Sequence, residues 1–156
     1  MPAGAKEIAK KVAIATIASA LVLSLTGCAA GNNAVTRNIK QVTDGSEAEI
    51  NKDGNLIYLR NIHVAINSAG DASIIGTIIN QKDTEDALIA VAIGAKEIKI
   101  EPIPALLNRP ITFGGPTSNA NAVLLASDLV AGTHTTVSFF FGIGGAVTMD
   151  VLVVNA

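Results

Sequence analysis

A series of short apolar segments, beginning near residue 56 and alternating with turn-forming residues, constrains the fold more than any other feature. In "LIYLRNIHVAI", Ile62, Val64 and Ile66 fall on one face of an extended strand, whereas Asn61 and His63 fall on the other. Similar segments recur roughly every 8 to 14 residues, separated by Gly, Pro and Asn. No segment after residue 56 keeps a helical period for three turns. The pattern therefore predicts an all-β, antiparallel β-sandwich.

The remaining strands are expected in seven stretches, namely 71–80, 87–94, 97–103, 110–113, 121–127, 133–143 and 146–154. Three prolines between residues 101 and 110 make that stretch a loop or a sheet edge. "GIGG", residues 142–145, is expected to be a hairpin turn, because Val147 stands where a dinucleotide-binding loop needs its third glycine. In the last hairpin, Phe139 and Phe141 should face the core and Phe140 the opposite side.

The N-terminal segment has the features of a secretory signal peptide. Lys6, Lys10 and Lys11 precede the uncharged run "VAIATIASALVLSL", residues 12–25. This run is shorter than the roughly 20 residues that a helix needs to cross a bilayer. We therefore expect residues 1–27 to be a signal peptide with a helical apolar part.

The end of this segment reads Leu25, Thr26, Gly27, Cys28, and it resembles a bacterial lipobox. The resemblance implies cleavage before Cys28 and attachment of diacylglycerol to its Sγ, for which a thiolate is the nucleophile. The alternative is an ordinary secretory signal with a chance cysteine near its cleavage site. The expected protein is anchored in the cell membrane by lipid and faces away from the cytoplasm, in the periplasm or cell-wall space.

The single cysteine also bears on how the exported domain is stabilised. With Cys28 used for lipid, no disulfide is available, and stability must come from an apolar core. Hydrophobic residues make up 49% of the chain, which is enough for two inner sheet faces. Residues 28–55 are polar and rich in Gly and Asn, so we expect a flexible tether there and the β-sandwich domain at 56–156.

Charge and aromatic content exclude nucleic acid as a partner. After residue 27 the chain has 8 basic and 12 acidic side chains, with no basic block. Nucleic-acid binding needs a positive surface and usually stacking aromatics. The chain has five aromatic residues, which are Tyr58, Phe113, Phe139, Phe140 and Phe141.

No motif of a known catalytic or cofactor site is present. The sequence lacks H-E-x-x-H, C-x-x-C, a phosphate-binding loop and G-x-S-x-G, and it shows no nucleophile paired with a base. We therefore expect neither an enzyme nor a bound cofactor.

Few residues could bind a metal. The weak candidates are His63, His134 and Met149, each better explained as a surface or edge residue. With the last turn near residues 143–144, His134 should pair near residue 153 or 154, roughly 15 Å along the strand from Met149. Asp83, Glu85 and Asp86 form an acidic loop that could hold Ca²⁺ weakly or be simply solvated, and Asp86 could instead bond a backbone amide.

Two stretches resemble periplasmic copper chaperones of the PCuAC type. They are "TIINQKDTEDALIAVAI", residues 77–93, and "LASDLVAGTHTTVSFFF" followed by "VTMDVLVV". The sequence also resembles actinobacterial lipoproteins of the LpqE type, which are related to that family. The resemblance covers roughly residues 56–154 and implies an immunoglobulin-like or cupredoxin-like sandwich.

The copper ligands implied by this resemblance are missing. The family binds Cu(I) through two His and two Met, one pair being a His-x-Met motif after Gly-Gly. Here "GGPTSNANAVLL" puts Asn121 and Val123 at those positions. The earlier His would fall within residues 97–102, which contain neither His nor Met. An amide and an isopropyl group do not select Cu(I) as imidazole and thioether do.

Two functions remain from these observations. The first is a membrane-anchored, non-enzymatic sandwich that acts as a binding or accessory module in the cell envelope, with an unidentified protein partner. The alternative is a copper-handling lipoprotein with a non-standard ligand set. Fold alone does not decide between them.

Overall fold

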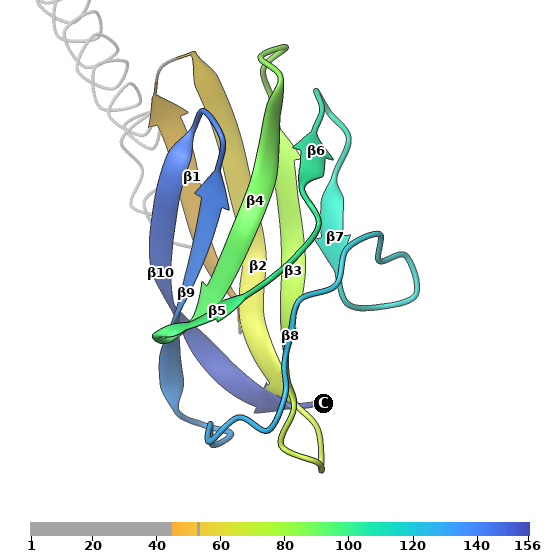
Figure 1. Ribbon diagram of the computed structural model, residues 1–156, viewed down its shortest axis with the longest axis vertical. Coiled ribbons are helices and arrows are strands. Elements are labelled where there is room, and N and C mark those ends of the chain that lie inside the picture. Colours follow the sequence, from red (N-terminus) through yellow and green to blue (C-terminus); the bar gives the residue numbers. More distant parts are fainter. Residues whose placement is uncertain (1–44, 53) are drawn as a thin grey trace, which may run out of the picture. The chain divides into compact units, whose positions relative to one another are not determined.

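The structure is a computed structural model that describes residues 45–52 and 54–156. The predicted signal peptide, Cys28 with its lipobox, and the first part of the predicted tether lie outside the described residues. The described part is all-β (Figure 1). Its ten strands are β1 (Ser46–Lys52), β2 (Asn55–Ile66), β3 (Ala72–Asn80), β4 (Asp86–Ile93), β5 (Lys96–Ile98), β6 (Ile103–Ala105), β7 (Ile111–Phe113), β8 (Val123–Leu124), β9 (His134–Phe141) and β10 (Gly145–Asn155). Over these residues, no helix is long and apolar enough to cross a membrane.

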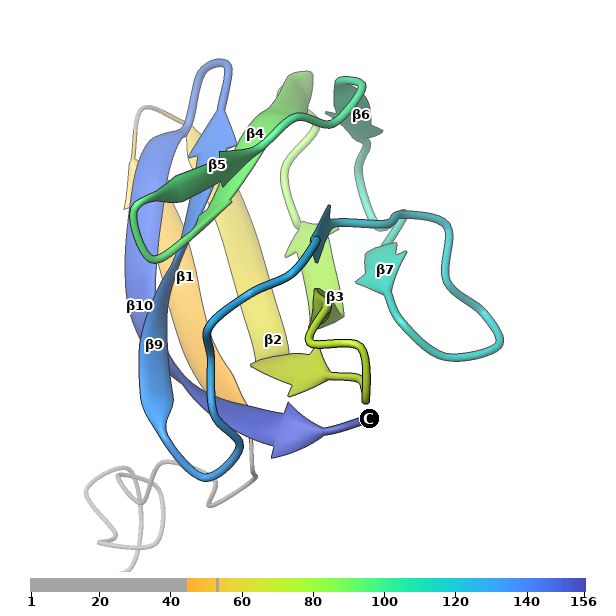
Figure 2. The same ribbon diagram turned by 60° about the horizontal axis from the view of Figure 1, so that its bottom comes forward.

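The strands form two layers that enclose the core (Figure 2). One layer contains β1, β2, β3, β7 and β8, and the other contains β4, β5, β6 and β9. The all-β sandwich expected from the alternating segments is therefore confirmed. The proline-rich stretch is also an edge, as predicted, because its three-residue strand β6 pairs only with β4 among the described strands.

Strand β10 belongs to both layers. From Gly145 to Leu152 it pairs antiparallel with β9, and from Val153 to Asn155 it pairs parallel with β2. Among the described strands this is the one parallel pairing, and the other strand pairs are antiparallel as expected. The reason is the length of β10, whose 11 residues are enough to cross from one layer to the other. β10 continues along the edge of β2 where β1 ends, since β1 pairs with β2 only between Asn55 and Ile62.

The sheet begins earlier than the sequence pattern predicts. Residues 46–52 and 55, assigned above to the flexible tether, form β1 and the first position of β2. In β1 only Ile50 is buried, and Glu47 and Glu49 are exposed on the outer face. An edge strand with one buried side chain has little apolar content, so its composition resembles that of a linker.

A β-bulge near the middle of β2 changes which residues face the core. Ile57 and Leu59 are buried before it, and Ile62 and Val64 after it, so the inward position shifts from odd to even numbers. Asn61 takes up the extra residue with a positive φ of 54°. The facing position on β3 is Gly76, with φ 139°, where an added Cβ would lie 2.6 Å from Ile62 Cδ1 and 2.8 Å from the Asn61 carbonyl oxygen.

The core lies between the layers and contains mainly branched aliphatic side chains. Its largest fully buried members are Phe113, Phe139, Ile57, Leu59, Ile62, Ile74, Ile78, Leu88, Ile93, Val64, Val91 and Val137. The rings of Phe113 and Phe139 pack across it with centroids 6.3 Å apart. As expected, Phe139 and Phe141 point into the core, and Phe140 lies on the outer face with 36% of its surface exposed.

Candidate binding site

Asp86 is a buried carboxylate that fixes the turn between β9 and β10. Its side chain is inward on β4, and the residue is 7% exposed. Oδ1 accepts hydrogen bonds from the backbone N–H groups of Ala87 at 2.7 Å and Ile143 at 2.9 Å, and Oδ2 accepts one from Gly144 at 2.8 Å. Three backbone N–H donors thus satisfy the two oxygens of this buried carboxylate. The expected bond from Asp86 to a backbone amide is therefore present, and two of the donors lie 57 and 58 residues away in the chain.

Asn80 joins the two loops beside this turn. Its Nδ2 donates to the carbonyl oxygens of Thr84 at 3.0 Å and Ala105 at 2.8 Å, and its Oδ1 accepts from the Lys82 N–H at 2.9 Å. Its backbone carbonyl accepts from the Asn108 N–H at 2.8 Å. Asn80 is 1% exposed. One buried amide thus holds the β3–β4 loop, the end of β6 and the β6–β7 loop in a fixed arrangement.

Asn55 is the third buried polar side chain at this end of the sandwich. It is 1% exposed, and neither its Nδ2 nor its Oδ1 has a hydrogen-bond partner among the described residues. It opens β2, where the Thr84 hydroxyl donates to the neighbouring Gly54 carbonyl at 3.3 Å.

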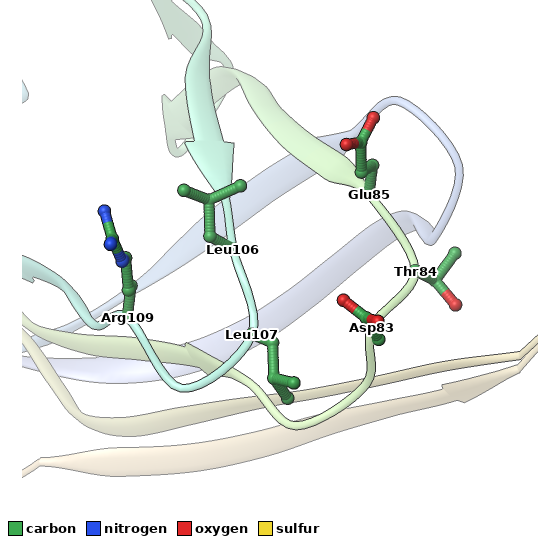
Figure 3. A pocket seen from close by; sticks show the side chains of 6 residues that line it. All are labelled: Asp83, Thr84, Glu85, Leu106, Leu107 and Arg109. Atoms are coloured by element: carbon green, nitrogen blue, oxygen red, sulfur yellow. The ribbon is translucent and has the colours of Figure 1, made fainter.

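The two loops that Asn80 connects enclose a cleft of about 300 Å³, called here the loop cleft (Figure 3). One wall is the β3–β4 loop and the other is the β6–β7 loop. The lining residues are Asp83, Thr84, Glu85, Leu106, Leu107 and Arg109. Figure 3 shows Glu85, Leu106 and Arg109 directed to the same side of the two loops. Acidic groups, an apolar surface and a guanidinium are therefore arranged side by side.

The structure does not bring the three weak metal candidates together. His63 lies on the outer face of β2, with Nδ1 3.1 Å from the Asn61 carbonyl oxygen. His134 lies at the start of β9, with Nδ1 3.6 Å from a carboxylate oxygen of Asp150. Met149 faces the core and is 8% exposed. The two histidines lie in different layers and Met149 lies between the layers, so the three side chains do not converge on one ion.

The register of the last hairpin corrects one expectation. His134 pairs with Leu152, not with residue 153 or 154, and Met149 pairs with Val137. His134 and Met149 are therefore three positions apart along the ladder, roughly 10 Å instead of 15 Å. An odd number of positions puts the two side chains on opposite faces of the sheet, which separates them further.

Two further places where the sequence could put metal ligands also lack a suitable set. Strands β5 and β8, which hold part of the stretches where the family resemblance would put copper ligands, contact each other. Asn121 is exposed and Val123 half-buried there, and neither is a soft ligand. In the acidic loop, Asp83 and Glu85 are exposed while Asp86 points inward. Across residues 45–52 and 54–156, no three His, Cys, Asp or Glu side chains form a group that could hold a metal ion.

The loop cleft was not predicted from the sequence. Asp83 and Glu85 stood out only as a charged loop, and Leu106, Leu107 and Arg109 as part of a proline-broken stretch. A polar Asn at the end of an apolar strand, as at Asn80, is a signal that a buried amide could connect loops, but it does not say which loops.

Comparison with protein-family models and with characterised protein sequences gives no match. Solved structures do match. An apo PCuAC domain from PmoF1 is 20% identical and aligns with a TM-score of 0.57 over 71% of this chain and 100% of its own. A copper-bound PCuAC domain from PmoF2 is 18% identical, with a TM-score of 0.55 over 71% of this chain and 99% of its own. The described domain therefore has the β-fold of PCuAC domains.

Proposed function

We propose that this chain is a lipid-anchored lipoprotein on the outer side of the cytoplasmic membrane, whose PCuAC-like sandwich is a non-enzymatic binding module. The observation that carries the proposal is a PCuAC-like fold in which His63, His134 and Met149 point in different directions. The lipobox-like residues up to Cys28 support the anchor. A PCuAC-like fold that lacks a converging set of imidazole and thioether ligands is better suited to bind a ligand other than Cu(I).

Copper handling is the second candidate. It is favoured by the similarity to the copper-bound PCuAC domain from PmoF2, and the fold comparisons support it more directly than they support a general binding module. At 18% identity this similarity concerns the fold. A copper site here would need a non-standard ligand set, with His134 as its most accessible imidazole.

A competition titration of the full chain against a Cu(I)-chelating dye separates the two candidates. The binding-module proposal expects affinity no tighter than micromolar, and equal values for the parent and for His134→Ala. His63→Ala is the matched control, because it removes the other imidazole from a different layer. Stoichiometric capture at sub-picomolar affinity that is lost in His134→Ala would reject the first candidate and establish the second.

The anchor is tested separately by membrane fractionation. Cys28→Ala removes the thiol that would carry the lipid, so this variant should remain unprocessed or leave the membrane fraction. Ser24→Ala, a small change outside the four lipobox residues, should fractionate as the parent does. Mature Cys28→Ala protein that stays firmly in the membrane would contradict the anchor.

A further inference from the structure

We propose that the loop cleft binds a short peptide with a free amino terminus, an apolar side chain and a free carboxylate. The amine would lie against Asp83 and Glu85, the apolar side chain against Leu106, and the carboxylate against Arg109. The inference refines the binding function proposed above and is independent of the lipid anchor.

The charges of the loop cleft are the first argument. Asp83, Glu85 and Arg109 are exposed, and within the described part of the chain none of them has a salt-bridge partner. Charges of both signs thus line one small site without neutralising each other. A simple anion would be repelled by the two carboxylates and a metal cation by the guanidinium, whereas a ligand with separate positive and negative ends is attracted by both.

The apolar surface between these charges is the second argument. Leu106 and Leu107 are 39% and 41% exposed, so two adjacent leucines remain partly in water. They lie on the same loop as Arg109, and Figure 3 shows Leu106 directed to the side of Glu85 and Arg109 and Leu107 to the opposite side. Covering Leu106 with an apolar side chain removes hydrocarbon surface from water, which favours binding.

The rigidity of the walls is the third argument. Asn80 bonds to both loops, and the Asn80 and Leu107 backbones also form an isolated bridge. Asp86 fixes the strand end that follows the β3–β4 loop. Loops already held in place lose little freedom on binding, which preserves affinity. The volume of about 300 Å³ is at the small end of ligand sites, so it fits a peptide of a few residues.

The test uses the isotope-labelled full chain in detergent micelles and the free tripeptide Ala-Leu-Ala as probe. Two-dimensional amide spectra should show saturable shifts centred on residues 83–85 and 106–109. The same tripeptide with an acetylated amine and an amidated carboxyl end lacks both charges and should bind at least tenfold more weakly. Replacing its Leu by Asn should also weaken binding, because it removes the apolar contact.

Charge-removing variants locate the two ends of the peptide. Arg109→Gln should weaken binding roughly threefold to fivefold, as expected for an exposed ion pair. Lys99→Gln is the matched control, since it removes an exposed positive charge from β5's flank, and it should bind as the parent does. Asp83→Asn with Glu85→Gln should weaken binding similarly, whereas Glu49→Gln with Glu97→Gln should not.

The outcomes are distinct. Equal binding of the capped and free tripeptides, shifts centred elsewhere, or no saturable shift would each overturn the assignment of the loop cleft. These results would leave the anchor and the copper titration unaffected, because those tests use other variants and readouts. Threefold to fivefold weaker binding in Arg109→Gln but not in Lys99→Gln supports the proposed orientation, and equal binding by both variants would overturn it.

Discussion

Replacing Asp86 by Asn tests how strongly one carboxylate holds the sandwich together. In the parent, its two oxygens accept backbone N–H groups of Ala87, Ile143 and Gly144 at 2.7, 2.9 and 2.8 Å. An Asn has the same shape but only one accepting atom. It can keep either the pair of bonds at Oδ1 or the single bond at Oδ2, and its amide group then faces at least one N–H donor.

The expected loss follows from these bonds. One charge-assisted hydrogen bond, about 1.5–3 kcal/mol, disappears, and each remaining bond becomes neutral, with a loss of roughly 0.5–1 kcal/mol. Water reaches the turn, since Ile143 is 54% exposed and Gly144 half-buried. Hydrogen bonds from the freed N–H groups to water therefore offset part of the lost free energy. We therefore expect Asp86→Asn to lower the free energy of unfolding by about 2–3 kcal/mol, which lowers Tm by roughly 10 °C.

Urea denaturation of the two proteins, followed by far-ultraviolet circular dichroism, measures this loss. Asp128→Asn is the matched control, because that side chain is 90% exposed and its replacement should leave the urea midpoint close to that of the parent. Amide hydrogen exchange at Ile143 and Gly144 should accelerate in Asp86→Asn. A stability within about 0.5 kcal/mol of the parent would falsify the view that this carboxylate anchors the hairpin.

Three further predictions concern the packing and the surface. Gly76→Ala should destabilise the domain by about 2–4 kcal/mol in urea, because its Cβ meets the facing bulge and its φ is positive; an unchanged midpoint contradicts this. Phe139→Ala should cost about 3–5 kcal/mol and Phe140→Ala under about 1 kcal/mol, and similar losses would refute the assigned faces. A backbone hydrogen bond, and then Lys96, hold the pKa of the Asp128 carboxyl below its ordinary value of 3.8. This small stabilising effect is present above the unfolded pKa and is lost as pH falls through the folded pKa. Lys96→Gln should raise the pKa of Asp128 in an NMR titration, and an unchanged pKa would show that the backbone bond alone sets it.

The sequence predicts the strands well where apolar residues alternate, and less well where the chain departs from regular pairing. The segments that became β2, β3, β4, β9 and β10 were visible from their side chains alone, because one face of each must be buried. The bulge at Asn61 shifts that alternation by one residue, and no composition signal marks it. β1 is polar and Ile50 is its only buried residue, so its composition predicts a tether and not a strand.

Long-range contacts explain why the candidate site was not found. The sequence predicts that Asp86 bonds an amide nearby in the chain, and it does bond Ala87. Its other two N–H donors belong to the β9–β10 turn, which the strand topology places beside Asp86. The loop cleft likewise combines residues 83–85 with 106–109. Such sites depend on which strand ends meet at one end of the sandwich, and a single sequence does not encode that in any local pattern.

The double membership of β10 has a consequence for the order in which the chain can fold. The edge of β2 from Val64 to Ile66 receives its partner only from Val153 to Asn155, the last three residues of that strand. Synthesis starts at the N-terminus, so this edge stays open until residues 153–155 have been made. During that time its exposed backbone groups can pair with another chain. This side of the sandwich is therefore closed only once residues 153–155 have paired with β2, and until then the open edge can be captured by a neighbouring molecule.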